Sequence, residues 1–232
     1  MNDKLTGFVL SISDYKEADC MMQVLSEQYG MLTLIAKSSK KISSKNHFLP
    51  LCTYEFIIDY KENKTIFSVH GHKLLKSYFD NDDLEYISFK NIIIELTSRY
   101  KEQVDFETIN FIFEKMNKEN RYLLGSMYLS HLIKGFGITP RVDGCVVCDN
   151  KKVVSLSNRQ GGFICLDHLN GLDPIDVERL KKFRLIIKGS FEHYDILKDF
   201  SYDFKDFSML MDFFIENTGV NVKSYSFYKT IY

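Results

Sequence analysis

The stretch CVVCDNKKVVSLSNRQGGFICLDH, residues 145–168, carries the clearest chemical pattern in the chain. It begins with the pair Cys145 and Cys148, and it ends, after sixteen intervening residues, with the pair Cys165 and His168. A spacing of two residues lets both side chains of a tight turn point at one metal ion, and structural zinc takes four such thiolate or imidazole ligands. The pattern therefore predicts one zinc ion held by these four residues.

The residues between the two pairs indicate a strand, a turn and a returning strand. Gly161 and Gly162 supply the backbone freedom that such a return needs. We therefore expect a zinc element spanning residues 141–170. The alternative is four unrelated residues, which does not explain why they fall into two matched pairs. Four protein ligands would close the coordination shell, and neither H-x-E nor H-E-x-x-H occurs, so the zinc is expected to be structural.

Upstream of this element, short runs of alternating apolar and polar residues predict β-strands. Five runs qualify, at residues 4–12, 18–27, 31–37, 53–60 and 65–75. Short strands with turn signals between them and no helical period favour a small antiparallel barrel. Five strands in this length match the size of an OB-fold. Oligonucleotide binding is frequent among OB-folds, although the fold alone does not establish function.

After residue 79 the apolar residues recur at helical spacing. The pattern predicts helices around residues 89–96, 109–116, 129–136 and 207–214. Asp173 and Pro174 favour the start of another helix, and Gly189 favours its end. We therefore predict an α+β protein, with an OB-fold barrel in residues 1–79 packed on a helical domain in residues 80–232. The zinc element is embedded in the helical domain.

Charge is segregated along the chain. The formal net charge is −1, which excludes a globally basic nucleic-acid binder but not a locally basic one. Residues 28–54 and 179–191 contain no Asp or Glu. Basic side chains in these stretches are candidate DNA contacts, because phosphate contacts position a nucleic acid without reading its sequence. They are Lys37, Lys40, Lys41 and Lys45 in the first stretch, and Arg179, Lys181, Lys182, Arg184 and Lys188 in the second. The alternative for the first stretch is a solvated loop.

Other classes of protein are disfavoured by what the sequence lacks. We find no Ser/His/Asp arrangement, no Walker-type phosphate loop and no prominent carboxylate pair, so no catalytic residue is assigned and no enzyme is expected. No apolar run approaches eighteen residues, so no membrane span is expected. The N-terminal residues lack the architecture of a signal peptide, which predicts a cytoplasmic protein. Cys20 and Cys52 lie in apolar surroundings and are expected to be buried thiols.

Several stretches together resemble the RecO family of bacterial recombination mediators. They are FVLSISDYKEADCMMQVLSEQYGMLTLIAK at residues 8–37, FLPLCTYEF at 48–56, GITPRVDGCVVCD at 137–149, LSNRQGGFIC at 156–165 and NVKSYSFYKTI at 221–231. Four positions depart from the family pattern. Ser38 replaces a glycine, His168 stands where zinc-bearing members usually have cysteine, and Tyr225 and Ser226 stand where basic residues often follow a Lys-Ser pair.

The resemblance implies a non-enzymatic, nucleoid-associated protein. Such a protein would bind single- and double-stranded DNA, anneal complementary strands, and work with RecR to load recombinase onto strands coated by single-stranded DNA-binding protein. The acidic, Phe-ending tail of that coating protein would dock among the helices, against a basic rim at Arg179, Lys182 and Arg184. Two alternatives remain open at this point: a zinc-stabilised RNA-binding or ribosome-assembly protein, and an enzyme of unrecognised mechanism.

Overall fold

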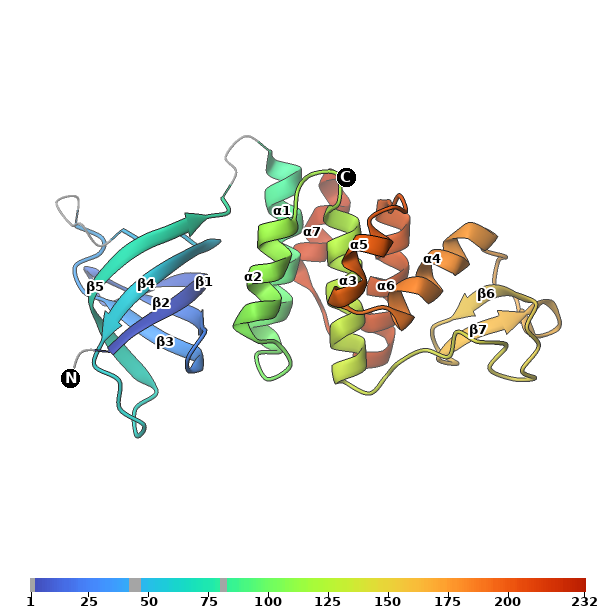
Figure 1. Ribbon diagram of the computed structural model, residues 1–232, viewed down its shortest axis with the longest axis horizontal. Coiled ribbons are helices and arrows are strands. Elements are labelled where there is room, and N and C mark those ends of the chain that lie inside the picture. The colour runs from blue at the N-terminus through green and yellow to red at the C-terminus, as the bar shows by residue number, and fades with distance from the viewer. Residues whose placement is uncertain (1–2, 42–46, 80–82) are drawn as a thin grey trace. The chain divides into compact units, whose positions relative to one another are not determined.

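The computed structural model describes residues 3–41, 47–79 and 83–232 (Figure 1). By internal contacts the chain divides into two compact units, Met1–Lys115 with Lys223–Tyr232, and Met116–Val222. The boundary that we expected after residue 79 separates the barrel from the helices, whereas this division groups two helices and the C-terminal segment with the barrel.

Five strands close into a barrel in the first unit, as the alternating pattern predicted. They are β1 (Asp3–Tyr15), β2 (Asp19–Ser26), β3 (Gly30–Ala36), β4 (Cys52–Ile58) and β5 (Ile66–Ser77), in the order β1-β2-β3-β5-β4. All neighbours are antiparallel except β3 and β5, which pair in parallel near Leu34 and Phe67. This order is that of an OB-fold, so the predicted fold class is confirmed.

The barrel core is built from every second residue along each strand, because successive side chains point to opposite faces. Inward-facing side chains such as Val24, Leu34 and Phe56 are fully buried. Cys20 and Cys52 lie in the same core as free thiols, which confirms their predicted state.

Two helices pack against the barrel within this unit, α1 (Leu84–Arg99) and α2 (Phe106–Lys115). The ring of Phe8 on β1 stacks on that of Phe113 on α2, with ring centroids 5.0 Å apart. Lys90 of α1 is buried, and its ammonium group donates to the carbonyl oxygen of Tyr78 at 2.7 Å. One aromatic contact from the middle of β1 and one polar contact from the residue after β5 therefore attach these helices to the barrel.

The C-terminal helix α7 (Lys223–Ile231) also belongs to the first unit and is held at its start by α1. The Glu95 carboxylate accepts hydrogen bonds from the backbone N–H groups of Lys223 and Ser224 and from the Ser224 hydroxyl, at 3.1, 2.7 and 2.6 Å. Burial raises the pKa of Glu95, but these hydrogen bonds outweigh it and hold the pKa below its usual value. The Lys-Ser pair therefore has a structural role, because it supplies the N-terminal donors that Glu95 satisfies.

The second unit combines helices with a two-stranded hairpin. Its elements are α3 (Arg121–Gly135), β6 (Val153–Ser157), β7 (Gly162–Cys165), η1 (Leu166–His168), α4 (Val177–Lys188), η2 (Phe191–His193), α5 (Tyr194–Leu197) and α6 (Phe204–Thr218). Helices α3 and α6 pack together through buried side chains that include Leu129 and Phe214. Helix α6 ends at Gly219, whose φ of 67° is the left-handed conformation that glycine adopts readily.

Helix α4 begins later than the sequence indicated. Its N-cap is Asp176, which accepts a hydrogen bond from the Arg179 backbone N–H, rather than Asp173. A tertiary contact delays the helix: the Ile175 backbone N–H donates to the Val154 carbonyl at 2.8 Å, which keeps this segment alongside β6. Along the described ranges, no helix is both long and apolar enough to cross a membrane.

Candidate metal centre and basic surfaces

The two ligand pairs predicted from the sequence meet in the structure. One potential ligand atom from each of Cys145, Cys148, Cys165 and His168 lies within 4.8 Å of the others. The Cys148 and Cys165 sulfurs are 3.7 Å apart, and the His168 Nδ1 atom is 3.7 Å from the Cys145 sulfur. A tetrahedral ion with metal–sulfur bonds of about 2.3 Å would have ligand–ligand edges of about 3.7 Å. The cluster therefore has the size and donors to hold a metal ion.

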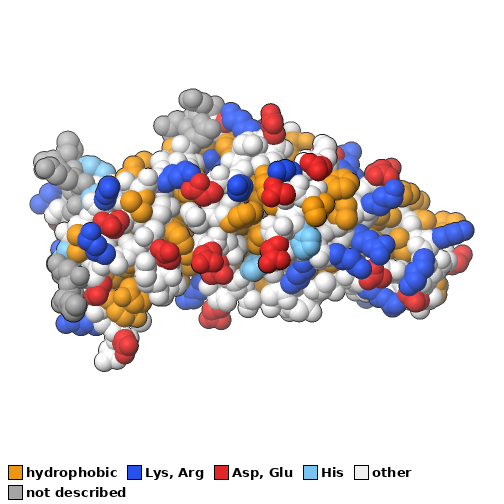
Figure 2. Space-filling model, in the orientation of Figure 1, with side chains coloured by type: hydrophobic (Ala, Val, Ile, Leu, Met, Phe, Trp, Pro, Cys, Tyr) orange, Lys and Arg blue, Asp and Glu red, His pale blue; other side chains and the backbone are white. Residues whose placement is uncertain are grey.

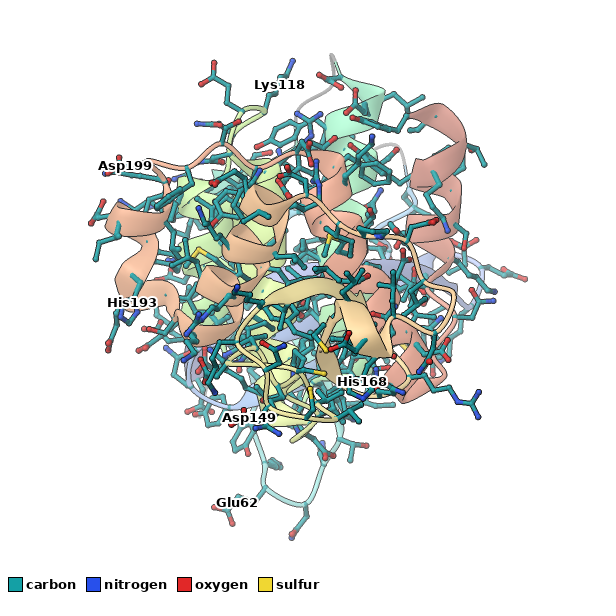
Figure 3. All side chains as sticks on the ribbon, turned by 90° about the vertical axis from the view of Figure 1, so that its right-hand side faces the viewer. Glu62, Lys118, Asp149, His168, His193 and Asp199 are labelled. Atoms are coloured by element: carbon teal, nitrogen blue, oxygen red, sulfur yellow. The ribbon has the colours of Figure 1, made fainter. Side chains whose placement is uncertain are left out.

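The local fold positions each pair. Cys145 and Cys148 lie in a turn closed by a hydrogen bond from the Asp149 N–H to the Cys145 carbonyl, at 2.9 Å. Cys165 ends β7, and the short helix η1 then brings His168 back toward the sulfurs. Figure 3 shows the labelled His168 beside the yellow sulfur atoms. The β6–β7 hairpin, which the sequence predicted, is what returns the second pair to the first.

The surroundings of Cys145 favour its thiolate form. Burial raises the pKa of this thiol, but backbone N–H groups of Cys148, Cys165 and Val147, together with the Cys165 thiol, lower the pKa to about 6. The pKa of Cys165 is raised instead, first by burial and then by hydrogen bonds with the neighbouring thiols. The backbone N–H groups stabilise the negatively charged thiolate, and the thiolate is the form of cysteine that binds a metal cation.

Substitution of Gly162 by Ala is expected to destabilise the hairpin more than the same change at Gly161. A Cβ atom at Gly162 would lie 2.3 Å from the Arg141 carbonyl oxygen, whereas Gly161 has open space around it. Arg141 is held there by backbone hydrogen bonds to Gly161 and Phe163. Gly162→Ala should therefore lower the free energy of unfolding by about 3 kcal/mol. Gly161→Ala should lower it by about 1–2 kcal/mol, because the φ of Gly161 is 74°.

Denaturant unfolding of the two full-length variants measures this difference. Equal losses would show that the approach of Arg141 to Gly162 is not a constraint on the fold. Metal content measured on the same samples would show whether the hairpin distortion reaches the ligands.

The first basic stretch follows the end of β3. Lys37 and Lys41 are exposed, and the Lys40 ammonium lies 2.8 Å from the Asp14 carboxylate. Ser38, at the position where the resembled family has glycine, has a φ of 56°, and its N–H donates to the Asp19 carboxylate at 2.8 Å. Lys45 lies outside the described residues.

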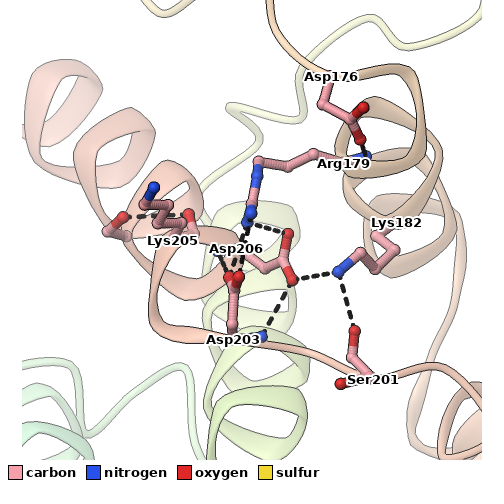
Figure 4. A network of polar contacts seen from close by, with 8 residues as sticks. Asp176, Arg179, Lys182, Ser201, Asp203, Lys205 and Asp206 are labelled. Carbon is pink, nitrogen blue, oxygen red and sulfur yellow. Dashed lines mark hydrogen bonds and ion pairs between the residues drawn. The ribbon is translucent and has the colours of Figure 1, made fainter.

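The second basic stretch is divided between two faces of α4. The Arg179 guanidinium contacts the carboxylates of Asp203 and Asp206 at 2.7 and 2.5 Å, and Lys182 contacts Asp206 at 2.5 Å (Figure 4). By contrast, Arg184 and Lys188 both pair with Asp143, at 2.7 and 2.5 Å. Lys181 pairs with Glu178 one turn earlier, at 2.6 Å. The basic residues lie close together in the sequence, but those that contact α6 and its N-cap have different acidic partners from those that contact Asp143.

Sequence reasoning missed the acidic partners of these cations and two lysines next to them. Lys151 and Lys152 stand at the start of the hairpin and line a pocket with Lys181 and Arg184. Their adjacency in the sequence, between the two pairs of metal ligands, is the signal that could have identified them. Tyr122 and Tyr128, on α3, are buried in the second unit and so do not offer their rings to an acidic tail.

Similarity to known proteins extends over nearly the whole chain. The family model described as "Recombination protein O N terminal" matches residues 1–78. A protein named "DNA repair protein RecO" from Bacillus cytotoxicus is 23% identical over 245 residues, covering 98% of this chain and 96% of the relative. Another of that name from Clostridium perfringens is 29% identical over 174 residues, covering 68% of this chain and 69% of the relative.

Proposed function

Because the chain belongs to the RecO family of DNA repair proteins, we propose that it acts as a recombination mediator. In this role it binds single- and double-stranded DNA without sequence preference and promotes annealing of complementary strands. It works with RecR to load recombinase, by binding alone and without a catalytic step. The observation that carries the proposal is the closed OB-type barrel with a lysine-rich loop after β3, in a chain similar to RecO proteins over almost its full length.

The experiment that tests this function compares two activities of the purified protein. Annealing of complementary DNA oligonucleotides, with and without RecR from the same organism, should be faster than the spontaneous reaction. Binding to a structured RNA of similar length is measured in parallel. Tight RNA binding without DNA annealing would favour the alternative of an RNA-binding or ribosome-assembly protein.

The metal is proposed to be a single structural Zn²⁺ ion. Three thiolates and one imidazole at x2 spacing are a donor set typical of structural zinc. Cys145, Cys148, Cys165 and His168 would hold the ion, leaving no position for a substrate. When bound, zinc would cross-link the turn before β6 to the end of β7.

Replacement of Lys40 and Lys41 by Ala is expected to reduce the salt dependence of DNA binding. Each phosphate contact adds about 0.7–0.9 to the slope of log affinity against log salt, so the double variant should lose about 1.5. The Lys40–Asp14 pair does not prevent this, because Asp14 is 88% exposed and such a surface pair contributes about 0–1 kcal/mol. Affinity should fall similarly for all DNA sequences.

Binding titrations at several salt concentrations give the slope. The matched control is Lys61→Ala with Lys64→Ala, which removes the same charge from an exposed turn of the same barrel. An unchanged slope in the Lys40 and Lys41 variant would show that this stretch is a solvated loop.

We also propose the acidic tail of single-stranded DNA-binding protein as a partner, which would have to compete with carboxylates of the chain itself. Arg179 and Lys182 are already engaged by Asp203 and Asp206, so tail carboxylates would have to compete with two carboxylates of the chain itself. Arg184 is the most accessible member of the proposed rim, with half of its side chain exposed. Action on chromosomal DNA would place the protein with the nucleoid in the cytoplasm.

A further inference from the structure

A pocket of about 320 Å³ lies between the β6–β7 hairpin and α4, and we call it the hairpin pocket. Its apolar lining comes from Val142, Val153, Phe163, Val177 and Leu180, and its charged lining from Asp143, Lys151, Lys152, Lys181 and Arg184. Four cations thus accompany one carboxylate. Figure 2 shows Lys and Arg side chains gathered over the part of the surface where Figure 1 places these elements.

We propose that the hairpin pocket binds one strand of DNA, with backbone phosphates at the cations and a base or sugar against the apolar lining. The inference rests on the proposed DNA-binding function and adds a site to it. The pocket combines residues that are distant in the sequence, since Lys151 and Lys152 come from the hairpin, and Lys181 and Arg184 from α4.

The charges favour a polyanion. The cations come from two separate elements on either side of an apolar lining, an arrangement that suits a chain with a charge on every repeating unit. An acidic peptide with one or two carboxylates would leave several of these cations without a counter-charge. Binding of a nucleic acid strand would also release the counterions condensed on it, which adds a salt-dependent gain.

The ion pairs already present do not close the site. Lys151 pairs with Asp149, Lys181 with Glu178 and Arg184 with Asp143, but each of these side chains is at least half exposed. Such pairs contribute about 0–1 kcal/mol, so phosphates can replace the carboxylates. Lys152 is exposed, and no ion pair of its side chain is found within the described residues.

The apolar part of the lining suits any base. Side chains such as Val153 and Val177 offer no hydrogen-bonding group to a base edge, and the face of every base can pack against them. The cations are assigned to the phosphates, which carry no sequence information. The site would therefore suit a protein that handles arbitrary single strands.

The first test removes the hairpin charges. Lys151→Gln with Lys152→Gln, in the full-length protein, should lower the slope of log affinity against log salt for oligothymidylate by about 1.4. The matched control is Lys198→Gln with Lys205→Gln, which removes two lysines from the same unit but away from the pocket. An unchanged slope, or an equal reduction in the control, would overturn the proposal.

The second test places a reporter in the pocket. The chain has no Trp, so Val177→Trp introduces a single indole at a position that lines the pocket and is 59% exposed. A base that stacks there should quench the Trp fluorescence, and the quenching should weaken when Lys151→Gln and Lys152→Gln are added.

The outcomes separate the inference from the proposed function. If the wild-type protein binds and anneals DNA but the Trp signal does not respond to oligothymidylate, the hairpin pocket is not a DNA site and the proposed function stands. Failure of the wild-type protein to bind DNA would overturn both. Quenching by an acidic, Phe-ending peptide but not by oligothymidylate would replace DNA with a protein partner at this pocket.

Discussion

Cys145→Ser is expected to remove the bound metal and to lower the melting temperature of the protein in one step. Cys145 is fully buried within the cluster of four potential ligands. Serine has no thiolate that could replace its sulfur as a ligand. Zinc binding in small modules contributes on the order of 10 kcal/mol at neutral pH, and it does so by folding the segment that carries the ligands. The hairpin between the ligands has only two strands, which are marginal without such a cross-link.

Metal analysis and thermal unfolding of the same preparation, purified without chelator, measure both effects. The matched control is Cys20→Ser, which changes a cysteine that is also buried but lies in the barrel core. The control should lose stability while keeping the metal. A Cys145→Ser protein that retains one equivalent of zinc and melts normally would show that the cluster is not the zinc site.

The barrel and the hairpin were predictable because local patterns encode them. Alternation along β2 and β3 places Met22, Val24 and Leu34 on the buried face, and the same alternation is visible in the sequence. The x2 spacing of each ligand pair is equally local. The returning strand β7 then brings Cys165 back to Cys148.

The polar contacts between distant segments were not predictable in this way. Glu95 and Ser224 are 129 residues apart, and Asp143 and Arg184 are 41 apart. No periodicity links such pairs, because each depends on how packed elements are oriented. The late start of α4 also depends on a contact between distant segments, because the Ile175 backbone N–H donates to the Val154 carbonyl of β6.

Asp206→Ala is expected to lower the free energy of unfolding by about 3 kcal/mol. The Asp206 carboxylate is 4% exposed and contacts both Arg179 and Lys182 at 2.5 Å. It also accepts a hydrogen bond from the Asp203 backbone N–H at 3.0 Å. Removal of one partner from a buried ion pair costs about 3–5 kcal/mol, because the remaining charge stays desolvated. The lower end applies here, since about a fifth of each cationic side chain reaches water.

Asp203→Ala is the matched control, because Asp203 contacts the same Arg179 but is 51% exposed. Its loss should be smaller, since water can replace the carboxylate. The Arg179 guanidinium holds the pKa of Asp203 well below its usual value of 3.8. A lowered pKa adds stability above pH 3.8 that is lost as the pH falls toward the folded-state pKa. Denaturant unfolding at neutral pH and in acid should therefore show the difference in stability between Asp203→Ala and the wild type shrinking in acid. Equal losses for both variants at neutral pH would show that burial of Asp206 adds nothing to the network.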